Sequence, residues 1–277
     1  MFGLIRSGMV TAMKELQVVS NNIANSGSTA FRKSDISFSD IYSQTASGMG
    51  SGAQLGSGSS VASVRTSDTQ GGMVEREGAL NLAIAGAGYF VVSPNSSPEN
   101  EVATLNYTRN GEFMLDAQGF LRGANNSYVM GTTSNSEQSE DGAATTALTK
   151  IQIPQSYGDD AEATLTDVRI SSDGIVSATY GADNSQELFK LSLANFPNQA
   201  GLNNLGGSVY MKTTASGEPQ LAFANASGMG SILSGMLETS NVDITMEMTA
   251  MIRSQQQFNG AARLLQTNAD MIEKLTR

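Results

Sequence analysis

The two ends of this chain carry the same apolar repeat. Between residues 2 and 25 the apolar positions are separated alternately by four and three residues, and they are Ile5, Met9, Ala12, Leu16, Val19 and Ile23. Between Asn241 and Arg277 they are Ile244, Met248, Met251, Phe258, Ala262, Leu265, Ala269 and Ile272, and Gln255 takes one expected apolar slot. Such alternating spacing places the apolar residues in a heptad-like seam along one side of an α-helix.

A long helix with one apolar seam needs a partner to cover it. The C-terminal run has about 34 residues, so at about 1.5 Å per residue it forms a rod of roughly 50 Å. Asn241 or Asp243 is placed to cap its first turn. We therefore predict an α+β fold in which long N- and C-terminal helices form a coiled-coil-like inner domain, with a central all-β domain inserted between them. The alternative is two separate amphipathic helices that pack on the central body.

The middle of the chain divides by composition. We expect the inner domain to comprise residues 1–43 and 226–277, including a short amphipathic element that is helical near Phe38–Tyr42. Residues 44–60 are rich in Gly and Ser and predict a flexible linker. This linker lacks the Lys and the strand–turn–helix context of a phosphate-binding loop. Residues 61–225 predict a β-rich outer domain, with a polar, acidic excursion near residues 132–165.

Turn residues indicate hairpins within the β-rich part. Asn110-Gly111 separates two expected strands, Leu105–Arg109 and Glu112–Leu115, and Asn-Gly is the strongest short hairpin signal. Asp173-Gly174 separates 168–170 from 175–178 in the same way. A further turn is expected at Asp116–Gly119. Leu80–Ile84 and Tyr89–Val92 are expected to be strands.

Composition excludes several kinds of chemistry. The chain contains no Cys and no His, so disulfides, thiolate metal sites, the usual zinc sites and His-dependent triads are excluded. The carboxylate pairs Glu140-Asp141 and Asp159-Asp160 lie in polar stretches, where nothing would raise a pKa for acid–base work. A weak Ca²⁺ site at Asp159, Asp160 and Glu162 is possible in principle, but the spacing of these residues does not match an EF-hand. We predict no catalytic, cofactor-binding or metal-binding residue and no small-molecule substrate.

Charge and hydropathy restrict the partners. The formal net charge of −10 disfavours binding to nucleic acid or to anionic membranes. No apolar stretch approaches the length of a membrane span, and Arg6, Lys14 and Glu15 interrupt the N-terminus where a cleavable signal would need an apolar core. Methionines are concentrated on both terminal helices, which favours adaptable helix packing over a thioether metal site.

Four motifs in order resemble the bacterial flagellar rod and hook family. They are Asn21-Asn22-Ile23-Ala24-Asn25 with Phe31-Arg32-Lys33, Leu80–Ile84 with Gly88-Tyr89-Phe90, Tyr107–Phe113 with Asp116 and Gly119, and Glu238–Asp243. Asn81 stands where that family usually has Asp. The positions that carry the resemblance are Asn21, Asn22, Asn25, Phe31, Gly88, Phe90, Arg109, Gly111, Ser240, Asn241 and Val242.

The resemblance implies a structural axial subunit with no enzymatic activity and no cofactor. It implies that many copies assemble into a helical tube through the paired terminal helices and transmit torque for motility. The implied partners are neighbouring rod, hook and junction proteins, the type III export apparatus and a cap chaperone. The implied location is the basal body and hook, from periplasm to exterior, reached without signal cleavage.

Two questions stay open at the level of sequence. Leu193–Phe196 with Gly201-Leu202 resembles the hook protein, whereas a length of 277 residues is closer to the rod proteins. A soluble adhesin or carbohydrate-binding module with helical ends is the alternative function, and it predicts a folded β body that never polymerises. A carboxylate-based hydrolase is a third hypothesis and would need a concave site with paired acids.

Overall fold

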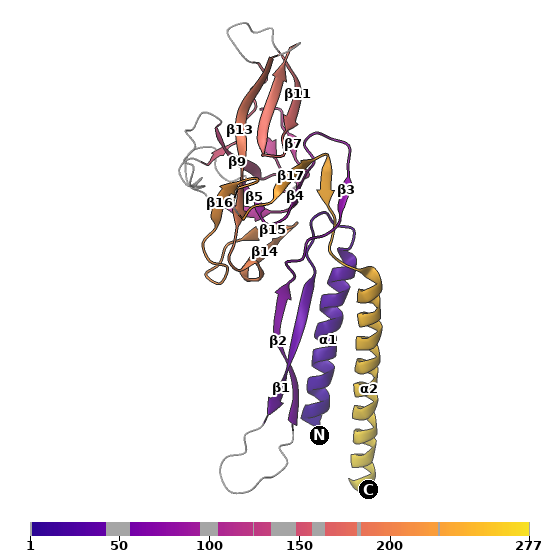
Figure 1. Ribbon diagram of the computed structural model, residues 1–277. Helices are drawn as coiled ribbons and strands as arrows, with labels where there is room; N and C mark the ends of the chain where they lie inside the picture. Colours follow the sequence, from indigo (N-terminus) through magenta and orange to yellow (C-terminus); the bar gives the residue numbers. More distant parts are fainter. Residues whose placement is uncertain are drawn as a thin grey trace. The chain divides into compact units, whose positions relative to one another are not determined.

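The chain divides into two compact units in the computed structural model, which describes residues 2–42, 56–94, 105–123, 125–133, 148–156, 164–181, 184–226 and 228–276. One unit comprises Met1–Gly27, Arg32–Ser67 and Asn241–Arg277 and contains both long helices (Figure 1). The other comprises Ser28–Phe31 and Asp68–Ser240 and is built from strands. The predicted arrangement of two terminal helices that flank a central all-β domain is confirmed.

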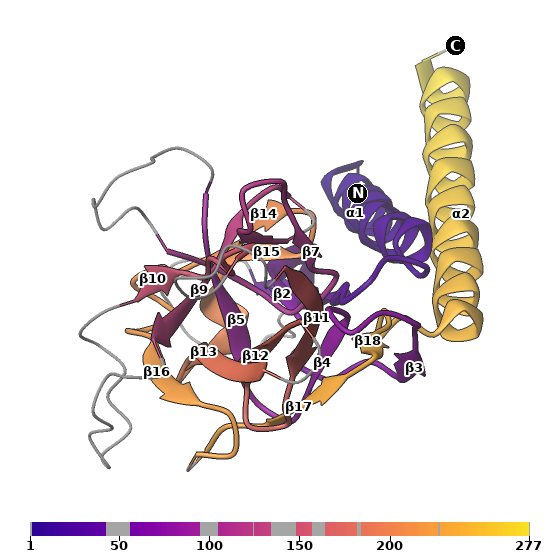
Figure 2. The same cartoon turned by 90° about the horizontal axis from the view of Figure 1, so that it is seen from above.

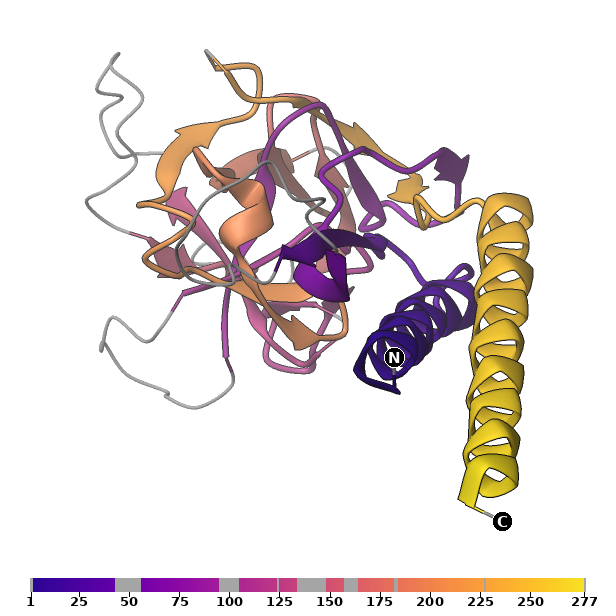
Figure 3. The same ribbon diagram turned by 90° about the horizontal axis from the view of Figure 1, so that it is seen from below.

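The helical unit is organised by two antiparallel helices, α1 (Phe2–Ala24) and α2 (Ile244–Thr276), which lie side by side in Figures 1 and 3. The N-cap of α2 is Asp243, whose carboxylate accepts the backbone N–H groups of Thr245 and Met246 at 2.9 and 3.1 Å. A capping carboxylate satisfies two otherwise unpaired donors and suits the positive end of the helix dipole. Asp243, one of the two expected caps, therefore starts the helix.

A long β-ribbon packs against α1 in the same unit. It pairs β1 (Ser34–Tyr42) with β2 (Gly56–Thr66) in antiparallel register. The expected helix near Phe38–Tyr42 is therefore wrong, and the last five residues of the expected linker, 56–60, are strand. Residues 44–55 of that linker lie outside the described residues. The period-two alternation of Ile36 and Phe38 with serines is the strand signal, and serine hydroxyls pair across the ribbon at Ser39 and Ser60.

The β unit contains a 12-stranded sheet in which every pairing is antiparallel. Its main path runs β11-β12-β13-β9-β5-β6-β15-β14, and β7, β8, β10 and β16 pair beside it. The bounds are β5 (Tyr89–Ser93), β6 (Asn106–Thr108), β7 (Met114–Leu115), β8 (Leu121–Arg122), β9 (Tyr128–Thr133), β10 (Thr149–Lys150), β11 (Leu165–Ile170), β12 (Ile175–Tyr180), β13 (Asn184–Asn195), β14 (Asn203–Gly206), β15 (Val209–Met211) and β16 (Gln220–Phe223).

The long strand β13 holds the β unit together. Its first half pairs with β12 and with β9, and its second half pairs with β16 and with β5. The view in Figure 2 shows these strands surrounding β13 and β5. Two apolar clusters result, one around Phe90, Phe113 and Leu191 and one around Tyr89, Tyr107 and Phe196. Burial, together with Glu218, raises the pKa of the Tyr107 hydroxyl to about 12, so this core tyrosine stays neutral.

Two short pairs of β-strands connect distant parts of the β unit. β3 (Met73–Glu75) pairs with β18 (Met236–Glu238), and β4 (Leu82–Ala85) pairs with β17 (Ser231–Ser234). Residues 231–238 thus pair with the first strands of the β unit, and the prediction that residues 226–277 belong to the helical domain is wrong for this segment. The unit boundary lies at Ser240 instead.

The two hairpin predictions have different outcomes. Asp173-Gly174 joins β11 to β12, with Ile170 opposite Val176 and Gly174 at a φ of 78°, so this hairpin is confirmed. The Asn110-Gly111 hairpin is wrong, because β6 pairs with β5 and β15 while β7 pairs with β8. The turn at Asp116–Gly119, which joins β7 to β8, is confirmed. The Asp116 carboxylate accepts the N–H groups of Gln118 and Phe120 there.

Candidate assembly surface

The face between α1 and α2 is more polar than the sequence pattern predicts. On α1 the buried residues are Thr11, Ala12, Glu15, Val19 and Asn22, of which Thr11 contacts the Ser59 hydroxyl of β2 at 3.3 Å. On α2 Glu247 and Ser254 are buried, and Met251, Phe258, Ala261 and Leu265 are half-buried along the same side. These positions again alternate by four and three residues, so the helix does present a heptad-like side to its neighbours.

On α2, the positions that face inward are not all those of the predicted seam. Ile244, Met248, Ala269 and Ile272 are exposed, whereas Met251, Phe258, Ala262 and Leu265 are half-buried. The polar slot in the buried side is Ser254, with no exposed surface, and Gln255 is exposed. On α1 the predicted Ala12 and Val19 are buried, and Ile5, Met9, Leu16 and Ile23 are half-buried.

Polar contacts between the helices explain why the inward-facing side of α2 differs from the predicted apolar seam. Arg253 of α2 donates a hydrogen bond to the buried Glu15 of α1 at 3.0 Å. Asn22 of α1 donates to the buried Glu247 of α2 at 3.1 Å. Glu15 and Asn22 are seven residues apart, as are Glu247 and Ser254, so each pair keeps the heptad period with polar residues. A search for apolar repeats overlooks them, and a period search that includes polar residues would have found them.

Asn22 is the residue that joins three elements of the helical unit. Its side chain is 1% exposed. It accepts the backbone N–H of Ser34, donates to the carbonyl of Ser34, both at 3.0 Å, and donates to the Glu247 carboxylate. Asn241 acts beside it by accepting the backbone N–H of Lys33 at 2.7 Å. Both Asn residues therefore fix the start of the β1–β2 ribbon, which explains why these amide side chains stand at their positions.

We predict that Asn22→Ala destabilises the helical unit by about 2 kcal/mol or more, because it leaves a buried carboxylate and two backbone groups without their partner. Thermal unfolding followed by far-UV circular dichroism measures the loss of helix. Asn21→Ala at the exposed neighbouring position is the matched control and should leave the transition unchanged. Equal transitions for the two variants would contradict this role of Asn22.

A groove of about 670 Å³ runs between α1 and α2. Its lining residues are Val10, Met13, Lys14, Leu16, Gln17, Ser20, Met251 and Gln255. Val10 and Met13 are 50% and 55% exposed. An apolar groove with a polar rim on a pair of helices is a typical surface for binding a further helix.

Other large apolar side chains on both helices are also exposed. On α1 these are Phe2 and Leu4, and on α2 they include Met246, Met248, Ile252, Leu264, Met271 and Leu275. A long helix with exposed apolar residues on more than one side is suited to contacts with several neighbouring helices. None of the described helices is long and apolar enough to cross a membrane.

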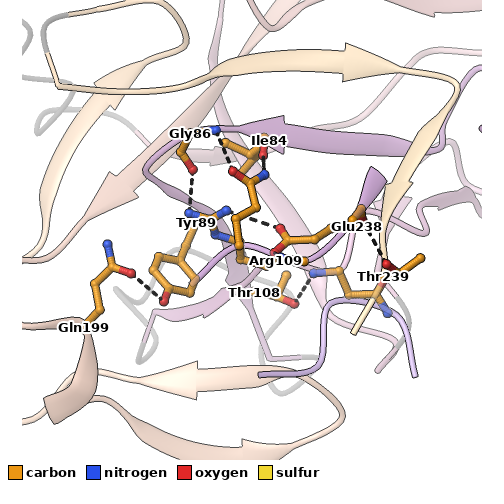
Figure 4. A network of polar contacts seen from close by, with 12 residues as sticks. Ile84, Gly86, Tyr89, Thr108, Arg109, Gln199, Glu238 and Thr239 are labelled. Atoms are coloured by element: carbon orange, nitrogen blue, oxygen red, sulfur yellow. Dashed lines mark hydrogen bonds and ion pairs between the residues drawn. The ribbon is translucent and has the colours of Figure 1, made fainter. Parts of the chain in front are cut away.

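The β unit contains a buried ion pair at the centre of a polar network (Figure 4). Arg109, which is 3% exposed, contacts the carboxylate of Glu238, which is 2% exposed, at 3.2 Å. The same guanidinium donates to the carbonyl of Gly86 at 2.7 Å and stacks over the ring of Tyr89 at 5.2 Å.

Glu238 also binds the backbone of two other segments. Its second carboxylate oxygen accepts the N–H of Gly71 at 3.1 Å, and its own carbonyl accepts the N–H of Ala30 at 2.8 Å. Thr239 continues the contact by donating its N–H to the carbonyl of Gly72. The pair thus connects residues 30, 71, 109 and 238, which are far apart in the chain.

The other residues that carry the family resemblance are buried, half-buried or in close contact with the backbone. Gly111 approaches the backbone of Leu82 so closely that a Cβ atom would lie 1.8 Å from the Leu82 carbonyl oxygen. Gly88 has a φ of 130° and packs against Leu193. Phe90 is fully buried against Phe113. Asn25 ends α1 by donating to the carbonyl of Asn21. Phe31, Ser240 and Val242 are half-buried.

The described residues provide little for acid–base chemistry. Among them, no three acidic side chains are grouped to hold a metal ion. A second groove of about 600 Å³, in the β unit, has Asp167 as the one titratable residue of its lining. A side-chain hydrogen bond from Arg169 holds the pKa of Asp167 below its usual value. The pairs Glu140-Asp141 and Asp159-Asp160, and Glu162, lie outside the described residues.

Comparison with known proteins places these features in a family. Residues 83–178 match the model of the flagellar hook protein FlgE/F/G D1 domain, and residues 233–277 match that of the flagellar basal body rod FlgEFG protein C-terminal region. The flagellar basal-body rod protein FlgG of Caulobacter vibrioides is 31% identical over 96% of this chain and 94% of its own length. That of Bacillus subtilis is 31% identical over 97% and 95%. The flagellar hook protein FlgE of Treponema pallidum is 30% identical over 74% of this chain but only 39% of its own length.

The chain belongs to the flagellar rod and hook protein family. It is a structural subunit of the flagellar axis, and the comparisons give no support to an adhesin or a carbohydrate-binding module. The relatives are rod and hook proteins and not hydrolases.

Proposed function

We propose that the chain is a rod subunit of the FlgG type. The observation that carries this choice is coverage. The rod relatives cover 96% and 97% of this chain and nearly all of their own length, whereas the matched hook protein is more than twice as long as its matched part. The hook-like run Leu193–Phe196 lies in β13 and the turn after it, and Leu193 and Ala194 are fully buried. Because these residues are buried in the core, their presence does not distinguish a hook protein from a rod protein.

Assembly is the mechanism of this function. Many copies pair their terminal helices in a coiled-coil-like inner layer, and the β units make lateral contacts. The exposed apolar residues on both sides of α1 and α2 support this role, because a monomer would gain nothing from leaving them in water. The polymer transmits torque between the basal body and the hook. From the resemblance we add export without signal cleavage by the type III apparatus, and contacts with a cap chaperone and with junction proteins.

The half-buried residues of the helix pair provide a direct test. We expect Leu265→Asp in α2, and likewise Leu16→Asp in α1, to abolish assembly, because a carboxylate cannot be accommodated among apolar side chains without a partner. The measurement is swimming motility of a deletion strain that expresses each variant, with electron microscopy of its basal bodies. Leu265→Met keeps the volume and apolar character and should restore motility. Normal motility and intact filaments with both Asp variants would refute the assembly role.

A further inference from the structure

The sequence contains the dipeptide Asn-Gly at Asn110-Gly111 and at Asn259-Gly260. This dipeptide is prone to spontaneous deamidation, because glycine has no side chain to shield its backbone nitrogen. That nitrogen attacks the side-chain carbonyl carbon of the asparagine, the amide nitrogen leaves as ammonia with the proton of the attacking N–H, and a cyclic imide forms. Water then opens the imide at either carbonyl and gives aspartate or isoaspartate. Each dipeptide is therefore a candidate modification site.

The folded β unit holds the Asn110-Gly111 dipeptide in a fixed geometry. Asn110 is only 8% exposed. Its backbone N–H donates to the Thr108 hydroxyl, and its side-chain oxygen accepts the N–H of Glu112, both at 3.0 Å. The carbonyl of Gly111 accepts the N–H of Leu82 at 3.0 Å. Imide formation must turn the Asn110 side chain toward the nitrogen of Gly111 and rotate the backbone between them, so these contacts oppose it.

The hydrogen bond to the Asn110 side-chain oxygen also has an effect of opposite sign. A donor at this position stabilises the negative charge that develops on the oxygen during the attack, which would assist the reaction. The packing of Gly111 decides the balance, because a Cβ atom there would lie 1.8 Å from the Leu82 carbonyl oxygen and the backbone has no room to move. Isoaspartate fits still less well, since it adds a carbon atom to the main chain beside Gly111.

We propose that Asn110 is a deamidation site that is open in the unfolded chain and closed by folding of the β unit. Isoaspartate at this position prevents the close approach of Gly111 to Leu82, so it destabilises the β unit. A chain that stays unfolded for long thus loses stability irreversibly, whereas a folded chain is protected. Asn259 is exposed on α2 and belongs to the helical unit, so it provides an internal reference for the same dipeptide.

Peptide mapping by mass spectrometry measures deamidation at both sites in the full chain. Samples are incubated at mildly alkaline pH in native buffer and in concentrated guanidinium chloride. We expect Asn110 to react in guanidinium chloride, as Asn259 does, and to react at least about tenfold more slowly in native buffer, where reaction requires opening of the β unit. A rate at Asn110 in native buffer that matches or exceeds the rate in guanidinium chloride would overturn the proposal.

Two variants assign the protection to one unit. Glu238→Gln weakens the β unit, so it should raise the rate at Asn110 in native buffer and leave the rate at Asn259 unchanged. If this variant does not fold, its rate at Asn110 should equal the rate in guanidinium chloride. Asn22→Ala weakens the helical unit and should leave the rate at Asn110 unchanged. An unchanged rate at Asn110 in Glu238→Gln, once urea unfolding shows this variant to be destabilised, would contradict protection by the β unit.

Pulse proteolysis tests the effect of isoaspartate on the β unit. A sample that has been partly deamidated in guanidinium chloride is refolded and digested briefly in urea, at the midpoint of the unfolding transition of the unmodified chain. We expect isoaspartate at position 110 to be depleted at least about fivefold in the surviving β unit, relative to aspartate at the same position, because aspartate has the same charge and an unaltered backbone. Equal survival of the two products would refute the effect on stability.

Discussion

Glu238→Gln is expected to destabilise the β unit by about 3–5 kcal/mol, the cost of removing one partner from a buried ion pair. Arg109 would stay buried at 3% exposure with its counter-charge gone. The N–H of Gly71 would also face a weaker acceptor. Urea unfolding, followed by near-UV circular dichroism of the buried tyrosines, reports on this unit because Tyr89 and Tyr107 are in its core.

A double-mutant cycle shows whether the loss belongs to the pair. Arg109→Gln alone should cost a similar amount, and the double variant should cost clearly less than the sum, because neither charge then remains buried without the other. Lys212→Gln breaks the exposed contact with Glu218 in the same unit and should leave the transition unchanged. If the two single losses simply add, Arg109 and Glu238 are not coupled.

Gly111→Ala is the second large effect that we expect. The new Cβ would lie 1.8 Å from the carbonyl oxygen and 2.7 Å from the carbonyl carbon of Leu82. Backbone atoms cannot rotate away as a side chain can, so β4 and the segment around Gly111 must separate. That movement also strains the hydrogen bond from the N–H of Leu82 to the carbonyl of Gly111. Overpacking usually costs about 1–3 kcal/mol and occasionally more, and we place this variant at about 3 kcal/mol or above.

Gly123→Ala is the matched control for Gly111→Ala within the β unit. The nearest atom to its new Cβ would be the Ser127 hydroxyl oxygen at 3.3 Å, which can move a few tenths of an ångström. We expect a loss below about 1 kcal/mol in the same urea experiment. A Gly111→Ala protein as stable as the control would mean that the close approach to Leu82 is not required.

The helices could be predicted from the sequence, but their contact side could not be predicted fully. Alternating apolar spacing is a local property, so both terminal helices and the Asp243 cap were accessible. The side that α2 turns inward depends on Glu15, Asn22 and Glu247, whose burial requires hydrogen-bond partners from a distant part of the chain. A periodicity of apolar residues alone does not show contacts between polar side chains that are more than 200 residues apart.

The β unit shows the same limit. Asp173-Gly174 joins strands that are neighbours in the chain, and the hairpin forms as expected. Asn110-Gly111 carries an equally strong turn signal, yet its flanking strands pair elsewhere, and Gly111 packs against the backbone of Leu82. The Gly/Ser-rich composition around residue 56 favoured a linker and concealed a strand. The resemblance marked Asn22, Arg109 and Gly111, and the structure supplies their reasons in hydrogen bonding, charge pairing and close packing.

We propose that this chain is a rod subunit. Electron microscopy of basal bodies from a strain that lacks the chain tests it most directly. We predict rods that end early, with the hook and all more distal structures absent, and recovery of complete basal bodies when the chain is supplied again. Intact rods that lack only the curved hook would identify a hook subunit, and complete hook–basal bodies without the chain would contradict its role as a rod subunit.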